Sequence, residues 1–319
     1  MKTITFHAMG SRILIAMDTE DIHLMDEALK ARDWFEEWEE SLSRFRLTSE
    51  LTRFNHHAGI PQKVSDTFFE VASLAKNANR QTDGLINPLI LNDLETAGYT
   101  GDFENLNTFA TDFLNRSSSL FTSESQLIDL DWGNRTVTIP FCAQLDFGGF
   151  AKGWAAHQTM LRLQSFAPVL VDAGGDIAVS SPLMDGTAWP IGVANPVNKE
   201  NNLAMIMIAK GGVATSGRDY HRWFANGGWQ HHIIDTRTHQ PADTDVYTAT
   251  VVAGDLMQAE MNAKMGIILG SEDGVAWLDA QSNVDYLLVL ENGELITSSG
   301  FIERQWTEKW NQITQSQLI

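Results

Sequence analysis

Cysteine, basic charge and long apolar runs are scarce in this chain of 319 residues. The single cysteine, Cys142, excludes an internal disulfide framework and a thiolate zinc site. The 22 Lys and Arg residues face 41 Asp and Glu residues, which gives a formal net charge of −19. Nucleic acid and anionic membranes attract Lys and Arg, so this balance argues against both as partners. No apolar run reaches the roughly 18 residues of a membrane span.

Two expectations follow from the local surroundings of the chain start and of the cysteine. Met1 runs directly into the alternating pattern of residues 3–6, without a basic segment, an apolar run or a lipobox cysteine. We therefore expect a cytoplasmic protein with no membrane anchor. Cys142 follows a predicted strand at residues 136–140, and we expect it to be a buried structural thiol.

The negative net charge does not exclude a phosphorylated ligand, because backbone amides, one lysine and a metal can make the electrostatic potential positive locally.

The periodicity of apolar residues predicts an α+β fold with mostly antiparallel sheets and flanking helices. Apolar residues spaced three and four apart from Leu24 to Phe45 predict one long amphipathic helix. Ser65 is the expected N-cap of a second helix that ends near Thr82-Asp83-Gly84. Further helices are expected over residues 151–163 and 256–269. Strands are expected over residues 3–17 (a pair broken at 9–11), 136–140, 169–172, 177–179, 205–209, 232–235 and 247–253, with a hairpin over 285–297. We expect one domain over 1–319, with 100–125 a variable excursion.

Two glycine-containing segments are candidate ligand contacts. In Leu145–Gly153 we expect a strand end, a glycine turn and a helix start, where backbone N–H groups and Lys152 can meet a phosphate; a plain tight turn is equally compatible. In Asp172–Asp176 paired glycines would let a flat ring or ribose approach the backbone, with Asp176 accepting from hydroxyls. A β-bulge with a structural aspartate explains the second segment at least as well.

The region from residue 211 to residue 270 contains the remaining candidate catalytic and ligand-binding residues. Alternation in a strand would place His231 and Ile233 on one face and His232 on the other, so that one histidine faces a pocket. A structural histidine is the more common case. Ser216 lacks the surroundings of a hydrolase nucleophile. Glu260 and Lys264 stand four residues apart on a predicted helix, either as a surface ion pair or as a carboxylate that binds Mg²⁺.

Taken in order, these segments resemble the ApbE family of FAD:protein FMN transferases, from about residue 5 to residue 300. The resemblance rests on Met9-Gly10-Ser11, on residues 43–46 and 49–55, on Asp83–Pro88, on Leu145–Gly153 and on Gly174-Gly175-Asp176. Thr215-Ser216-Gly217 and His232–Asp235 complete it. Each motif alone is weak evidence for the family, whereas the occurrence of all of them in a fixed order is strong evidence.

The resemblance implies a two-lobed fold with a central cleft for FAD, and Mg²⁺ at the pyrophosphate. The FMN phosphate would pass to a threonine hydroxyl of an acceptor protein, and AMP would leave. Some relatives instead hydrolyse FAD to FMN and AMP. In such phosphoryl transfer the placement of cations and of the nucleophile supplies most of the catalysis.

By position, the resemblance implies a role for each of a set of residues. The implied flavin and FAD contacts are Met9, Phe45, Leu85, Ile86, Asn87, Asp146, Lys152, Asp176, Thr215, Ser216 and His232. His232 is also the candidate general base, with Glu260 and Lys264 as the other implied catalytic residues. Ala151, through its carbonyl, and Glu260 match the metal-ligand positions.

The chain departs from the family pattern at three places. Asn87 stands where the family has Asp, and the Asp-Pro-Arg-Thr-Gly loop reads Asp235-Thr236-Arg237-Thr238-His239. The Ala-Asp-x-x-x-Thr metal pattern ends on Lys264, and a protonated lysine cannot ligate Mg²⁺. Lys264 would then occupy the cation position itself. The hypotheses are therefore a transferase with an altered site, an FAD-binding homologue with little turnover, and an FAD pyrophosphatase.

Overall fold

The computed structural model describes residues 1–101, 128–198, 200–219, 222–225 and 227–306. Within these ranges the centre of the molecule is an eight-stranded sheet in the order β1-β2-β6-β7-β10-β15-β16-β17, in which every neighbouring pair is antiparallel. Its strands are β1 (Lys2–Ala8), β2 (Ser11–Met17), β6 (Val169–Ala173), β7 (Asp176–Val179), β10 (Gly211–Gly217), β15 (Val246–Ala253), β16 (Asp285–Leu290) and β17 (Leu295–Thr297). The α+β fold class with mostly antiparallel sheet is confirmed, as is the terminal hairpin.

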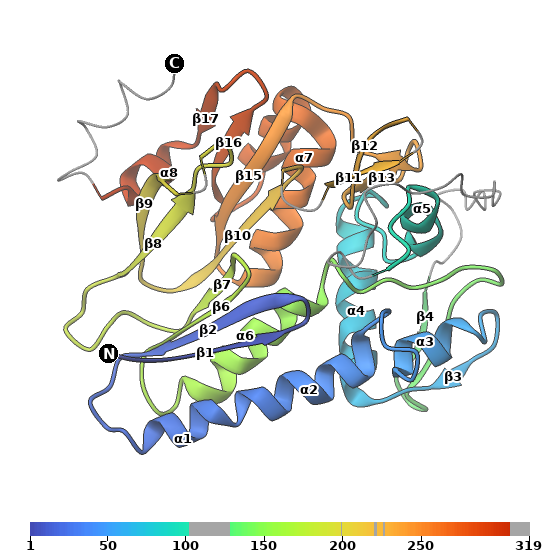
Figure 1. Cartoon of the computed structure of the whole chain (residues 1–319), viewed down its shortest axis with the longest axis horizontal. Coiled ribbons are helices and arrows are strands. Elements are labelled where there is room, and N and C mark those ends of the chain that lie inside the picture. The colour runs from blue at the N-terminus through green and yellow to red at the C-terminus, as the bar shows by residue number, and fades with distance from the viewer. Residues whose placement is uncertain (102–127, 199, 220–221, 226, 307–319) are drawn as a thin grey trace.

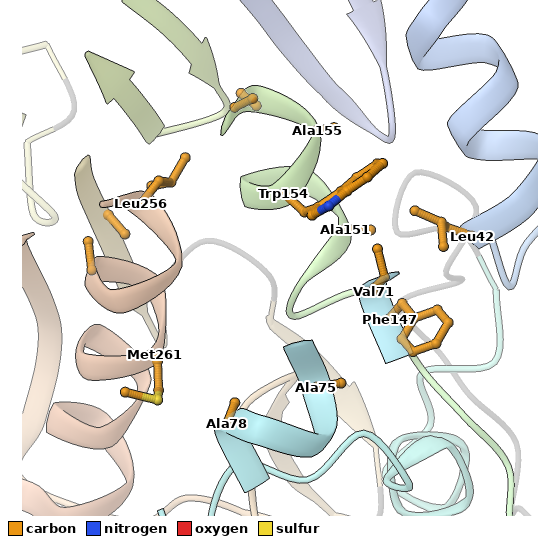
Figure 2. Packing of buried hydrophobic residues seen from close by; sticks show 14 of the residues in the cluster. Leu42, Val71, Ala75, Ala78, Phe147, Ala151, Trp154, Ala155, Leu256 and Met261 are labelled. Carbon is orange, nitrogen blue, oxygen red and sulfur yellow. The ribbon is translucent and has the colours of Figure 1, made fainter. Parts of the chain in front are cut away.

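Helices cover one face of the sheet (Figure 1). The helices of the described residues are α1 (Leu24–Leu29), α2 (Ala31–Leu42), α3 (Glu50–Asn55), α4 (Asp66–Gln81), α5 (Leu91–Thr96), α6 (Ala151–Leu163), α7 (Leu256–Asp279) and, on the opposite face, α8 (Ser299–Arg304). Of these, α6 packs on β6 and β7, and α7 packs on β10 and β15. Figure 2 shows Trp154 of α6 and Phe147 from its leading turn near Leu42 and Val71, and Met261 of α7 in another part of the same buried cluster.

The opposite face of the sheet is covered by a β-ribbon and by α8. The ribbon pairs β8 (Trp189–Ala194) with β9 (Asn202–Ile208). Successive side chains of a sheet strand point to opposite faces of the sheet. Val171 therefore packs in the core under the helices, and its neighbour Leu170 packs in the core under the ribbon. Both faces of the sheet are thus buried, which accounts for the continuous apolar character of its central strands.

Smaller pieces complete the described part of the chain. A three-stranded sheet has the order β3-β5-β4, and two short ribbons pair β11 with β12 and β13 with β14. Their bounds are β3 (Gln62–Lys63), β4 (Asp129–Asp131), β5 (Thr136–Thr138), β11 (Arg222–Ala225), β12 (Gly228–His231), β13 (Ile234–Asp235) and β14 (Gln240–Pro241). Almost all of the predicted excursion at 100–125 lies outside the described residues. No helix among the described residues is long and apolar enough to span a membrane.

Three local predictions are corrected by the structure. The long helix expected to reach Phe45 is broken at Lys30 and ends at Leu42, because Ser43 is extended and its hydroxyl accepts from the Phe45 amide at 3.2 Å. The strand expected over 232–235 begins only at Ile234. Cys142 is exposed, since it lies in a turn at a φ of 67°.

One further prediction is extended by the structure. The helix expected over 256–269 continues to Asp279, across a kink at Gly270.

Candidate functional site

A glycine turn leads into α6 and packs closely against α7. Lys264 donates from Nζ to the Gly149 carbonyl oxygen and to Glu260 Oε1, the second at 2.9 Å. The side chains of Lys264 and Glu260 are 15% and 8% exposed. The surface ion pair of the simpler interpretation is therefore wrong, because this pair lies between two helices.

Small residues permit this close approach of α6 to α7. A Cβ atom at Gly149 would lie 3.1 Å from Lys264 Nζ, and one at Gly153 would collide with Glu260 Oε2. The Lys264 ammonium also lies 5.4 Å from the centre of the Phe150 ring. The two glycines thus allow a cation and a carboxylate to sit at the start of α6, where the helix dipole is positive.

Asp176 lies beside the same charges. It starts β7 after a two-residue turn in which Gly174 and Gly175 have φ of 71° and 98°. Because Ala173 and Asp176 are directly paired, the segment is a tight hairpin and the β-bulge interpretation is wrong. Burial is the main cause of an Asp176 pKa raised to about 7; Glu260 raises it further, whereas Lys152 and Lys264 lower it.

Asp146 is held from both sides. Its Oδ1 accepts from the Gly148 amide at 2.8 Å, and its Oδ2 lies 3.0 Å from Arg44 Nε in a pair whose side chains are 7% and 9% exposed. The Arg44 guanidinium also stacks over the rings of Phe45 and Tyr99, at 4.4 and 4.3 Å. Asp146 therefore fixes an arginine that in turn supports the predicted flavin contact Phe45, which is 42% exposed.

The predicted flavin tripeptide Leu85-Ile86-Asn87 follows a left-handed turn, since Asp83 and Gly84 have φ of 47° and 88°. The Thr82 hydroxyl accepts from the Ile86 amide at 3.0 Å, and Asn87 Oδ1 accepts from the Leu89 amide at 2.9 Å. The Asp146 amide donates to the Pro88 carbonyl at 2.8 Å. These bonds bring the tripeptide and the Asp146 segment together.

The altered loop at residues 235–239 also reaches this turn. Thr236 donates from Oγ1 to the Gly84 carbonyl at 3.0 Å. Arg237 donates from both Nε and Nη2 to the Asp235 carboxylate, and from Nη2 to the Ile268 carbonyl at 3.1 Å. An ion pair and a threonine hydroxyl here hold a loop that lacks the proline and glycine of the family pattern.

The two adjacent histidines differ in their surroundings. His231 is 8% exposed, accepts at Nδ1 from the Ile233 amide and donates from Nε2 to the Ala242 carbonyl at 2.9 Å. Burial lowers the pKa of His231 to about 4. His232 is half-buried at the bend between β12 and β13. His231 is thus the structural member of the pair, and His232 stays the candidate base.

The other predicted contacts lie in a strand turn, at a strand end and at the start of α6. Met9, at a φ of 50°, occupies the turn between β1 and β2, and its amide donates to Glu39 Oε1 at 2.7 Å. Thr215 and Ser216 lie at the end of β10, with the Thr215 hydroxyl 2.9 Å from that of Thr250. Lys152 is half-buried in the first turn of α6.

The residues present do not fit a divalent metal in this arrangement. A cation would bind between the Gly149 carbonyl oxygen and Glu260 Oε1. Both oxygens already accept hydrogen bonds from the Lys264 ammonium. Ala151, whose carbonyl is the other predicted ligand, is the first residue of α6. Within the described ranges no group of three or more His, Cys, Asp or Glu residues could hold a metal ion.

Some supporting residues were not identified from sequence. Arg44 and Asn55 lie in segments that carry the family resemblance, but neither was assigned a role. Asn55 is buried, donates to the Leu145 carbonyl at 2.9 Å and accepts from the Leu145 amide at 2.8 Å, which places Asp146 next to it. Tyr99 and Trp223 were likewise assigned no role, and their rings stack with their centroids 5.0 Å apart. Only the neighbourhood of a recognised motif could have pointed to Arg44 and Asn55.

Solved flavin transferases share this fold. The ApbE protein from Thermotoga maritima superimposes with a TM-score of 0.82 at 24% identity, covering 96% of this chain and 99% of that one. The flavin transferase ApbE from Vibrio cholerae gives a TM-score of 0.76 at 25% identity, with 95% and 98% covered. The shared fold thus indicates a chain of the flavin-transferase class.

Sequence comparison identifies the family. The ApbE family description matches residues 9–288. An FAD:protein FMN transferase from Klebsiella pneumoniae is 30% identical over 305 residues, which cover 91% of this chain and 90% of the relative. One from Vibrio cholerae is 27% identical, with 84% and 79% covered. The chain belongs to the ApbE family, as the sequence motifs predicted.

Proposed function

We propose that this chain is an FAD:protein FMN transferase that moves FMN from FAD to a threonine hydroxyl of an acceptor protein. The threonine oxygen attacks the phosphorus of the FMN half and forms a phosphoester bond. The bond from that phosphorus to the oxygen bridging to AMP breaks, and AMP leaves with the electron pair. The hydroxyl proton passes to His232. The observation that carries this proposal is the buried Lys264 ammonium at the start of α6, in a chain of this family.

The proposed roles follow from where the residues lie. Lys264, Lys152 and the N-terminus of α6 provide positive potential for the pyrophosphate. Around the flavin we place Met9 and Phe45, and the tripeptide Leu85-Ile86-Asn87. For the remainder of FAD we propose Asp146, Asp176, Thr215 and Ser216, whose carboxylates and hydroxyls can accept from its polar groups.

For the cation we propose that Lys264 takes the place of Mg²⁺. Its ammonium is held by Glu260 and by the Gly149 carbonyl, so the position carries a fixed positive charge that belongs to the chain. An ammonium neutralises phosphate charge but cannot bridge and orient several oxygens as a metal does. This difference favours a second candidate function, an FAD-binding protein with little turnover.

One incubation separates the candidate functions. The purified protein is mixed with FAD, with and without Mg²⁺, and with a threonine-containing acceptor, while AMP, FMN and covalent flavin are followed. The transferase gives AMP and covalent flavin in equal amounts, without need of Mg²⁺. Free FMN without an acceptor identifies a pyrophosphatase. No AMP under any condition contradicts both enzymatic functions and leaves FAD binding.

Replacing the ammonium tests the cation assignment directly. Lys264→Thr leaves the Glu260 carboxylate buried without its partner, which costs about 3 kcal/mol of stability. We expect Mg²⁺ to raise the melting temperature of this variant and to be required for its AMP release, but to leave the wild type unchanged. Lys210→Thr, at an exposed lysine, is the matched control. A Lys264→Thr protein with no response to Mg²⁺ would contradict the assignment.

A further inference from the structure

The hairpin loop between β13 and β14 (residues 236–239) bonds to the chain both before and after the predicted flavin tripeptide. Before the tripeptide, Thr236 donates from Oγ1 to the Gly84 carbonyl. After it, His239 lies with Nδ1 3.0 Å from Oδ2 of Asp93, in the first turn of α5. The tripeptide and the start of α5 therefore run between two points that are bonded to the same loop.

Residues 85–92, which we call the flavin segment, are also bonded to the chain that leads into α6. The Pro88 carbonyl accepts from the Asp146 amide at 2.8 Å, and Asn92 donates from Nδ2 to the Cys142 carbonyl at 3.3 Å. Figure 1 shows α5, into which the flavin segment leads, beside β11 and β13. The conformation of the flavin segment thus depends on bonds to two other parts of the chain, one of which is the hairpin loop.

The backbone of His239 is in the left-handed region, with a φ of 58°. Its amide closes the hairpin loop by donating to the Asp235 carbonyl at 2.8 Å. This conformation is uncommon for a residue with a Cβ atom, whereas glycine adopts it freely. The turn by itself therefore does not require a histidine. What the histidine side chain adds is the bond to Asp93.

Asp93 is a buried carboxylate that needs a hydrogen-bond donor. It is 8% exposed, and burial raises its pKa, while the hydrogen bond from His239 opposes that rise. Because an ionised carboxylate can only accept, His239 Nδ1 is the donor. A bond to a charged acceptor is stronger than one between neutral groups, and burial keeps water from competing for it. The pair therefore joins the hairpin loop to α5 more firmly than an exposed contact would.

We propose that His239 and Asp93 are positioning residues for the flavin. Their bond joins the hairpin loop to the start of α5 and, together with the bond from Thr236, fixes both ends of the flavin segment. The tripeptide Leu85-Ile86-Asn87 is then held in one arrangement before FAD arrives, which lowers the entropic cost of binding. This role rests on the proposed binding of FAD by the tripeptide.

Titration of the purified full chain with FAD, followed by flavin fluorescence, tests the role of the pair. His239→Gly suits the left-handed backbone but removes the donor, and we expect it to raise the Kd for FAD about fivefold. The visible circular dichroism of FAD at saturation should change too, because the flavin contacts are less fixed. His239→Asn tolerates the left-handed backbone and can place an amide N–H near the position of Nδ1, so its Kd should stay within about twofold of the wild type.

Asn283→Gly is the matched control, because Asn283 is exposed and has the same φ of 58°. It should leave the Kd and the spectrum of bound FAD unchanged. The positioning role is overturned if His239→Gly binds FAD as tightly as the wild type, or if His239→Asn or the control loses as much affinity as His239→Gly. A wild type that does not bind FAD overturns this role and the proposed function together. A wild type that binds FAD but releases no AMP overturns the proposed transfer alone.

Discussion

Within the candidate site, several charged residues form ion pairs, one of them between distant parts of the chain and two between near neighbours in sequence. Asp146 meets Arg44, Glu260 meets Lys264, and Asp235 meets Arg237. Burial makes an unbalanced charge costly, so the partner matters as much as the residue itself. A substitution at one member is therefore expected to act through the charge that it leaves behind.

The buried His231 makes stability depend on pH. Its pKa is lowered from 6.5 to about 4, first by burial. The unfolded chain then binds the proton more readily than the folded one, so the stabilising effect of a neutral His231 is complete above about pH 6.5 and is lost toward pH 4. Between about pH 7.5 and 5 we expect the wild type to lose roughly 2 kcal/mol relative to His231→Gln.

The measurement is urea unfolding of both proteins at the two pH values. His23→Gln is the matched control, because His23 is exposed before the start of α1 and meets water in the folded and the unfolded chain. It should keep the wild-type dependence on pH. If His231→Gln loses as much stability on acidification as the wild type, burial of His231 is not the source of the dependence.

At the scale of helices and strands, capping residues and apolar periodicity predicted the elements whose ends depend on their own residues. Ser65 caps α4 by accepting from the Phe68 amide, and Ala151–Leu163 forms α6 as expected. Prediction failed where side-chain hydrogen bonds, which apolar periodicity does not report, bend the chain. The bend at His232 follows the bonds of His231 to Ala242 and Ile233, and the helix ends at Leu42 because Ser43 is extended and its hydroxyl accepts from the Phe45 amide.

The kink in α7 is another such case. Gly270 has φ 78° and ψ −176°, a region that is almost exclusive to glycine, and the helix restarts with Ser271 donating its amide to Asp245 Oδ1 at 2.9 Å. Gly270→Ala is expected to cost about 2 kcal/mol, because its backbone is strained there and its Cβ would lie 3.2 Å from Asp245 Oδ1.

Urea unfolding at neutral pH measures this cost. Gly254→Ala is the matched control, since a Cβ atom there meets nothing within 4 Å and its φ is not in the left-handed range. It should change stability by less than about 0.5 kcal/mol. Equal effects of the two substitutions would show that the kink is not strained.

In the molecule as a whole, the site is assembled from segments that share no local signal. The family motifs predict most of its positions, yet nothing in the sequence showed that the loop 235–239 bonds to the turn at Gly84, or that Asn55 holds residue 145. Such contacts depend on how sheet and helices bring distant chain segments together. Their loss should affect ligand binding more than folding.

The bond from the Thr236 hydroxyl to the Gly84 carbonyl tests this coupling. Thr236→Val keeps the shape of the side chain but removes the donor, at a cost of about 1 kcal/mol. If the bond positions residues 85–87 against the flavin, FAD affinity falls about fivefold in a fluorescence titration. Thr244→Val is the matched control, because it removes a similar hydroxyl bond, to the Ile267 carbonyl at 2.7 Å, at the far end of the first half of α7. Both variants should lose similar stability, and only Thr236→Val should lose FAD affinity. Equal affinities in the two variants would mean that the loop is held to the turn for folding alone.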